Sequence, residues 1–187
     1  EERERSLMKI AVVAMGKIGL PLAVQFAMKG HEVIGTDVNE KTVALINEGK
    51  EPFPGEAHLA EYLRELVPAG KLRATTDTTQ AVQSSDAVVV VVPLFVDKDG
   101  VPDFGWMDAA TESIGKGLHK GVLVSYETTL PVGTTRNRFA PALEKISGLK
   151  AGEDFTLVFS PERVLTGRIF SDLKRYPKLV GGINEKS

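Results

Sequence analysis

The chain has 187 residues, of which 42% are apolar and 26% charged, and its formal net charge is −2. This is the composition of an ordinary globular domain, and the small net charge gives no indication of a nucleic-acid partner or a polybasic membrane patch. The absence of cysteine excludes disulfides, thiolate zinc sites and a cysteine nucleophile within these residues. No apolar run reaches the ~18 residues of a membrane span. The three histidines are isolated, so no metal site is predicted.

Short apolar runs and helical patterns alternate along the chain after a charged segment, residues 1–7, that is expected to be disordered. In chain order the predicted elements are a strand over 8–14, a helix over 20–28, a strand over 31–37, helices over 39–49 and 59–66, a strand over 71–76, a short helix over 77–85, a strand over 88–92, a helix over 107–118, a strand over 121–127, a helix over 133–147, and strands over 155–162 and 177–182. Asn39 and Asp77 are predicted N-caps, and Gly30 and Gly49 are predicted C-terminal caps. Pro141 is expected to kink or restart its helix.

This alternation predicts one doubly wound α/β domain over residues 8–187, with a mainly parallel sheet of the Rossmann type. The run of five valines from Val88 to Val92 has no polar alternation, which is typical of a strand covered on both faces. Ligands of such sheets bind beyond the carboxyl ends of the strands. The residues that follow Ala14, Thr36, Val92, Tyr126 and Phe159 are therefore expected to line one cleft.

The turn after the first strand reads A-x-G-x-x-G, with Ala14, Gly16 and Gly19 in the spacing of the dinucleotide-binding fingerprint. Gly16 would let the backbone approach a pyrophosphate, and Gly19 would let helix and strand pack closely. Alanine at the first position is expected to be tolerated if its φ stays negative. Asp37, at the end of the next strand, would accept both ribose hydroxyls and repel a 2′-phosphate, which favours NAD over NADP. The alternative for Asp37 is a turn residue that caps a helix.

Four further segments carry a family resemblance, and they occur in a fixed order and spacing. They are PDFGWMDAA (102–110), YETTLPVGTT (126–135), SPERVLTG (160–167) and PKLVGG (177–182). In these segments the chain resembles the nucleotide-sugar 6-dehydrogenases from Met8 to its last residue. The letters PERV resemble most the branch that acts on UDP-N-acetylhexosamines, especially UDP-N-acetylmannosamine. The resemblance implies oxidation of the sugar C6 alcohol through an aldehyde to a carboxylate, with two NAD consumed.

The resemblance also assigns roles to individual residues. It implies that four places contact the cofactor. These are the turn (Ala14, Gly16, Lys17, Ile18 and Gly19), the end of the second strand (Asp37), the end of the valine strand (Val92, Pro93 and Leu94) and the end of the next strand (Thr129). Glu162 matches a general base or water-ordering glutamate, and Thr129 is expected to orient that water. Arg163, Val164 and Leu165 are expected to contact the substrate. The alternative for Glu162 is a loop carboxylate paired with Arg163.

Some letters depart from the family pattern. Ala14 replaces the first glycine, Lys17 stands where an aromatic residue is common, and Leu94 replaces a hydroxyl-bearing residue near the cofactor. The ammonium of Lys17 is expected to approach the pyrophosphate instead.

Family members use a cysteine nucleophile in their later half, and this chain has none. The chain is therefore expected to be the NAD-binding domain without the dimerising helix and the sugar-nucleotide domain, and to be inactive alone. The full-length protein is expected to be a cytoplasmic homodimer of polysaccharide biosynthesis that takes a UDP-sugar. Three alternatives stay open: a UDP-glucose 6-dehydrogenase, a stand-alone NAD-sensing module, and another NAD-dependent dehydrogenase that shares only the first half.

Overall fold

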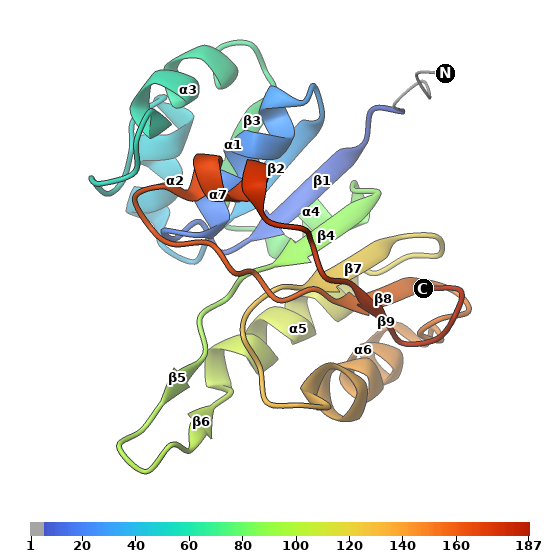
Figure 1. Cartoon of the computed structure of the whole chain (residues 1–187). Helices are drawn as coiled ribbons and strands as arrows, with labels where there is room; N and C mark the ends of the chain where they lie inside the picture. The colour runs from blue at the N-terminus through green and yellow to red at the C-terminus, as the bar shows by residue number, and fades with distance from the viewer. Residues whose placement is uncertain (1–5) are drawn as a thin grey trace.

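A computed structural model describes residues 6–187, and its centre is a seven-stranded sheet in the order β3-β2-β1-β4-β7-β8-β9 (Figure 1). The strands are β1 (Lys9–Val13), β2 (Glu32–Thr36), β3 (Leu72–Thr75), β4 (Ala87–Val90), β7 (Leu123–Tyr126), β8 (Thr156–Phe159) and β9 (Gly181–Gly182). All neighbours pair in parallel except β9, which runs antiparallel to β8. The predicted doubly wound, mainly parallel α/β fold is confirmed. Of the predicted charged extension, residues 1–5 lie outside the described residues.

Helices cover both faces of the sheet (Figure 1). On one face lie α1 (Gly19–Met28), α2 (Glu40–Asn47), α3 (Leu59–Leu66) and α7 (Ile169–Arg175). On the other lie α4 (Thr78–Gln83), α5 (Gly105–Gly117), the π-helical turn η1 (Thr135–Phe139) and α6 (Ala140–Ser147). A strand that is covered on both faces must carry apolar side chains on both, because successive side chains of a strand point to opposite faces.

The strand sequences divide between the two cores as this alternation requires. In β1, Ile10 and Val12 join the core under α1, whereas Ala11 and Val13 join the core under α5. The valine run divides in the same way, with Val89 and Val91 on the first side and the other three valines of the run on the second. The central strands are therefore buried on both faces, as predicted for the polar-free run.

The predicted caps are present where helices begin and end. The Asn39 side chain accepts hydrogen bonds from the amides of Lys41 and Thr42, and Asp77 accepts one from Gln80. Gly30 and Gly49 follow α1 and α2 with φ of +96° and +72°. These local bonds satisfy orphan backbone groups at the helix ends and fix where each loop leaves the sheet.

Three segments differ from the sequence prediction. The loop after the valines contains a hairpin of β5 (Phe95–Val96) and β6 (Pro102–Asp103), which projects from the body in Figure 1. The helix α7 was not predicted, because only a few of its side chains are apolar. The helix predicted over 133–147 begins as the π-helical turn η1, and the hydroxyl of Thr134 just before it donates to the Pro131 carbonyl. Before Pro141, which lacks an amide donor, the chain winds as the η1 turn.

Candidate functional site

The carboxyl ends of the parallel strands form one continuous edge. Backbone hydrogen bonds continue beyond the strands along it, from the amide of Ala14 to the Thr36 carbonyl and from the amide of Glu127 to the Val90 carbonyl. The strand order reverses between β1 and β4, so this edge contains the topological switch point at which open α/β sheets bind ligands. The five strand ends lie on this one edge, because the strands that carry them are parallel and adjacent. That the residues after them line one cleft stays a prediction.

The first position of the fingerprint differs from the expectation. Ala14 has φ +82°, so the condition of a negative φ is wrong. The chain must turn sharply between the end of β1 and the start of α1, and the left-handed conformation at this residue makes that turn. A side chain with a Cβ costs about 1–2 kcal/mol in this region. Ala14 is therefore a strained residue in the turn.

Gly16 and Gly19 occupy opposite environments. A Cβ on Gly16 would meet no atom within 4 Å, so the backbone there borders open space. A Cβ on Gly19 would overlap the carbonyl oxygen of Ala14 and lie 2.9 Å from Cγ2 of Val91. The third fingerprint glycine thus permits close packing of α1 against the sheet, while the second leaves the backbone accessible. This is the division of roles that the fingerprint requires.

Asp37 connects the end of β2 to the turn. Its Oδ2 accepts a hydrogen bond from the Met15 amide at 2.8 Å, and its Oδ1 accepts one from the Asn39 amide at 2.9 Å. The helix cap itself is Asn39, so Asp37 is not the capping residue of α2. A carboxylate has about four lone-pair sites, so two remain for a ribose diol. The residue is half-buried beside the turn.

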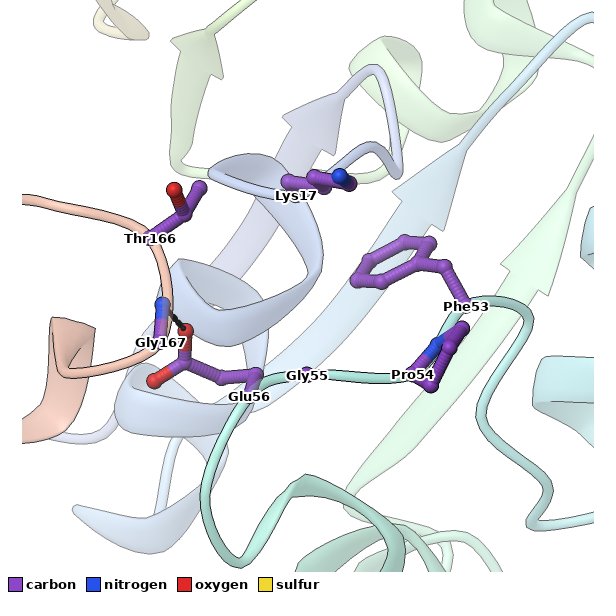
Figure 2. A pocket seen from close by; sticks show the side chains of 7 residues that line it. All are labelled: Lys17, Phe53, Pro54, Gly55, Glu56, Thr166 and Gly167. Atoms are coloured by element: carbon purple, nitrogen blue, oxygen red, sulfur yellow. Dashed lines mark hydrogen bonds between the residues drawn. The ribbon is translucent and has the colours of Figure 1, made fainter.

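Lys17 and Ile18 complete the turn. Lys17 is exposed and lines a pocket of about 150 Å³ with residues 53–56 and 166–167 (Figure 2). The buried carboxylate of Glu56 closes one side of the pocket and accepts from the amides of Gly167 at 2.6 Å and Ile169 at 2.9 Å. Glu56 therefore holds together two loops that are more than a hundred positions apart. The sequence prediction missed it, because its partners are backbone amides.

The ends of β4 and β7 are linked by a hydroxyl. Thr128 donates to the Val92 carbonyl at 2.7 Å, which holds the YETT segment against the valine strand. Its neighbour Thr129 is exposed. Pro93 is also exposed, and Leu94 packs partly against the core. On this edge Thr129 and Pro93 are therefore accessible, whereas Val92 is buried.

Glu162 follows β8 and is held at both carboxylate oxygens. Oε1 accepts from the Arg163 amide at 2.9 Å, and Oε2 accepts from the Lys178 ammonium at 2.6 Å. The alternative, a loop carboxylate paired with Arg163, is wrong in its partner: the ion pair is formed with Lys178, and the Arg163 guanidinium donates to the Pro177 carbonyl. Val164 is half-buried and Leu165 is exposed on the same loop, where the Leu165 amide donates to Asp172 of α7.

A second carboxylate, that of Glu127, shares the ammonium of Lys178 with Glu162, and the sequence prediction missed it. Glu127 is buried at the end of β7 and binds the same Lys178 ammonium at 2.6 Å. It also accepts from the Ser125 hydroxyl at 3.0 Å. Burial raises the pKa of Glu127 above its usual value, and the nearby ammonium opposes that rise. Burial works to lower the pKa of Lys178, but the two carboxylates outweigh it and the pKa is raised.

Among residues 6–187 no group of three His, Cys, Asp or Glu side chains lies close enough to hold a metal ion. No helix in the described part of the chain is both long and apolar enough to cross a bilayer. The fit to a dinucleotide rests on the open backbone at Gly16, the amides of the turn at the start of α1 and the carboxylate of Asp37.

Comparison with known proteins agrees with this geometry. The model of the UDP-glucose/GDP-mannose dehydrogenase family, NAD binding domain, matches residues 8–187. The UDP-N-acetyl-D-mannosamine dehydrogenase of Pyrococcus horikoshii is 35% identical over 180 residues, which is 96% of this chain and 42% of that protein. The UDP-N-acetyl-D-glucosamine 6-dehydrogenase of Pseudomonas aeruginosa is 39% identical over 160 residues, or 86% of this chain and 36% of that protein.

Solved structures agree as well. The NDP-N-acetyl-D-galactosaminuronic acid dehydrogenase of Methanosarcina mazei superposes with a TM-score of 0.91 at 36% identity, over 98% of this chain and 41% of that one. The chain thus spans about two fifths of the length of the proteins that it resembles. It belongs to the UDP-glucose/GDP-mannose dehydrogenase family, whose NAD binding domain it contains.

Proposed function

We propose that the chain is the NAD-binding part of an NAD-dependent UDP-N-acetylhexosamine 6-dehydrogenase that oxidises the C6 alcohol of UDP-N-acetylmannosamine to a carboxylate. The observation that carries this proposal is the SPERV segment, which places Glu162 on the same sheet edge as the glycine turn. Relatives named UDP-N-acetyl-D-mannosamine dehydrogenase, at 35–36% identity over most of the chain, support the choice of substrate.

In this proposal the residues of the turn bind the cofactor. The pyrophosphate lies over Gly16 at the start of α1, where free amides and the helix dipole favour an anion. The exposed Lys17 adds a positive charge there. Asp37 accepts the ribose hydroxyls and disfavours a 2′-phosphate, while Ile18, Val92, Pro93, Leu94 and Thr129 line the path toward the site of reaction. When bound, NAD supplies the hydride acceptor.

The carboxylate of Glu162 is proposed to accept the proton that the C6 hydroxyl loses, directly or through one water that Thr129 orients. Its two oxygens are already fixed, so a substrate or a water would meet a carboxylate of defined orientation. Arg163, Val164 and Leu165 are proposed to contact the sugar nucleotide. The thiol needed to oxidise the aldehyde and most of the sugar site would come from chain outside these residues, as would the dimer contacts.

Glu162→Gln tests the proposed role. The amide keeps the shape of the side chain but does not accept the proton, so full-length enzyme should lose at least about a hundredfold in kcat. NAD affinity, measured by calorimetry, should stay unchanged. Glu153→Gln makes the same change at an exposed glutamate before β8 and is the matched control. Unchanged kcat in Glu162→Gln would refute the assignment, and turnover by the 187-residue chain alone would refute the proposed need for a second part.

A further inference from the structure

A buried pair of carboxylates shares a single ammonium at the edge of the sheet. Lys178 Nζ lies 2.6 Å from Glu127 Oε2 and 2.6 Å from Glu162 Oε2. The Glu127 side chain is 6% exposed, that of Glu162 11%, and that of Lys178 40%. These residues come from the end of β7, the loop after β8, and the segment between α7 and β9. These three segments are therefore joined through one cation.

Two carboxylates this close repel each other unless a positive charge lies between them. Lys178 supplies that charge, and its ammonium has three donors, of which these bonds use two. In the described part of the chain the neighbouring cation, Arg163, forms no ion pair with either carboxylate, and its guanidinium donates to the Pro177 carbonyl. The uncharged hydroxyl of Ser125 also donates a hydrogen bond to Glu127, at its other carboxylate oxygen Oε1. The position of the Glu162 carboxylate thus depends on Lys178.

Glu127 in turn fixes Lys178. Its carboxylate is the more deeply buried of the two, and its backbone is tied at both ends of the residue. The Glu127 amide donates to the Val90 carbonyl, and its carbonyl accepts from the Glu162 amide at 2.9 Å. A rigid buried anion therefore anchors a flexible ammonium, and the ammonium orients the less buried carboxylate.

We propose that Lys178 is a positioning residue for Glu162, with Glu127 as its buried counter-charge. This inference rests on the proposed role of Glu162 as proton acceptor. Lys178 and Glu127 would act through Glu162 and would touch neither substrate nor cofactor. With the Arg163 amide on Oε1 and the Lys178 ammonium on Oε2, the Glu162 carboxylate is held at both oxygens, and about two of its four lone-pair sites stay free for the substrate hydroxyl or its water. Without the ammonium only the amide would hold it, and Oε2 would be free to turn toward solvent.

Removal of the ammonium tests the proposal in full-length enzyme. Lys178→Met should lower kcat at least about tenfold with KM and NAD affinity little changed, because only the orientation of the proton acceptor is lost. Lys178→Arg keeps the positive charge and should retain about a third or more of the wild-type kcat. Lys174→Met, an exposed lysine on α7, is the control and should match wild type.

A double-mutant cycle separates positioning from simple stabilisation. In the Glu162→Gln background, Lys178→Met should change kcat by less than about twofold, because a residue that acts through Glu162 has nothing left to orient. If the double variant instead lost kcat by the product of the two single-variant factors, the proposal would be overturned. The acid limb of the pH–kcat profile should also move to higher pH in Lys178→Met, since the two carboxylates then face each other without a cation. An unchanged acid limb would overturn it too.

The two proposals fail in different ways. If wild-type full-length enzyme releases no NADH with any UDP-sugar, the proposed function fails. If wild type is active and Lys178→Met equals it, only this inference fails. A carboxyl-carbon NMR titration of the 187-residue chain needs no turnover: the pKa of Glu127 should rise in Lys178→Met and stay near the wild-type value in Lys178→Arg. An unchanged Glu127 titration in Lys178→Met would show that the ammonium does not hold this pair.

Discussion

Adding one methyl group at each of two fingerprint glycines should separate folding from cofactor binding. In Gly19→Ala the new Cβ would overlap the Ala14 carbonyl oxygen and lie 2.9 Å from Val91 Cγ2. The first of these neighbours is backbone at an already strained residue, so the clash requires α1 to move away from the sheet. We expect a loss of about 3 kcal/mol, the upper end for overpacking. For a chain of this size that lowers Tm by roughly 6–12 °C.

In Gly16→Ala the same methyl group meets no protein atom within 4 Å. Its stability should therefore stay within about 0.5 kcal/mol of wild type, as for an ordinary surface substitution. NAD affinity should nevertheless fall at least about tenfold, because the methyl group would occupy the space proposed for the pyrophosphate, and a tenfold loss is about 1.4 kcal/mol.

Calorimetric unfolding and NAD titration of the two variants measure both quantities. The reasoning predicts a thermally weakened Gly19→Ala and a stable Gly16→Ala that binds NAD poorly. An unchanged Tm in Gly19→Ala would refute the close packing of helix and strand. Wild-type NAD affinity in Gly16→Ala would refute the position of the pyrophosphate.

Three other variants test single contacts. Ala14→Gly should raise stability by up to about 1 kcal/mol, since it relieves the left-handed strain at the cost of extra freedom in the unfolded chain, and a lower urea midpoint would contradict this. Asp37→Ala should weaken NAD binding and narrow its preference over NADP; calorimetry with both cofactors decides, and equal affinities in wild type would refute the role of Asp37. Burial raises the pKa of Tyr126, whose hydroxyl lies 2.7 Å from Oγ1 of Thr111. The neutral phenol of Tyr126 should therefore stabilise the fold fully below about pH 10, and this contribution should be lost as the pH rises further. In Tyr126→Phe the free energy of unfolding, measured in urea, should fall less steeply with alkaline pH than in wild type. An equal slope in the variant would contradict that reasoning.

Much of the fold was predictable because it depends on local signals. The valine run specifies a strand buried on both faces, and Asn39 and Asp77 start helices through bonds to amides two or three residues away. Parallel strands then bring their carboxyl ends to one edge, which placed the turn and Glu162 together. The φ of Ala14 was not predicted, because the geometry of the turn, rather than the preference of alanine, determines it.

The contacts behind the site depend on residues distant in sequence. Lys178 lies 51 positions from Glu127, and Glu56 lies 111 positions from its partner Gly167. No local pattern marks such pairs, since a lysine after a proline or a glutamate in a loop is usually a solvated surface residue. The family resemblance included the segments that contain Glu127 and Lys178, but it did not indicate that they meet.

The most direct test is to count the NADH released by full-length protein from a limiting amount of UDP-N-acetylmannosamine. The proposed function predicts two NADH per sugar and slower turnover with UDP-glucose. Because the alcohol and the aldehyde each give up one hydride, a ratio of two requires both oxidations. One NADH per sugar would contradict oxidation to the carboxylate, and a preference for UDP-glucose would contradict the proposed substrate. No NADH from any UDP-sugar would contradict the proposal that the full-length protein is a UDP-sugar dehydrogenase.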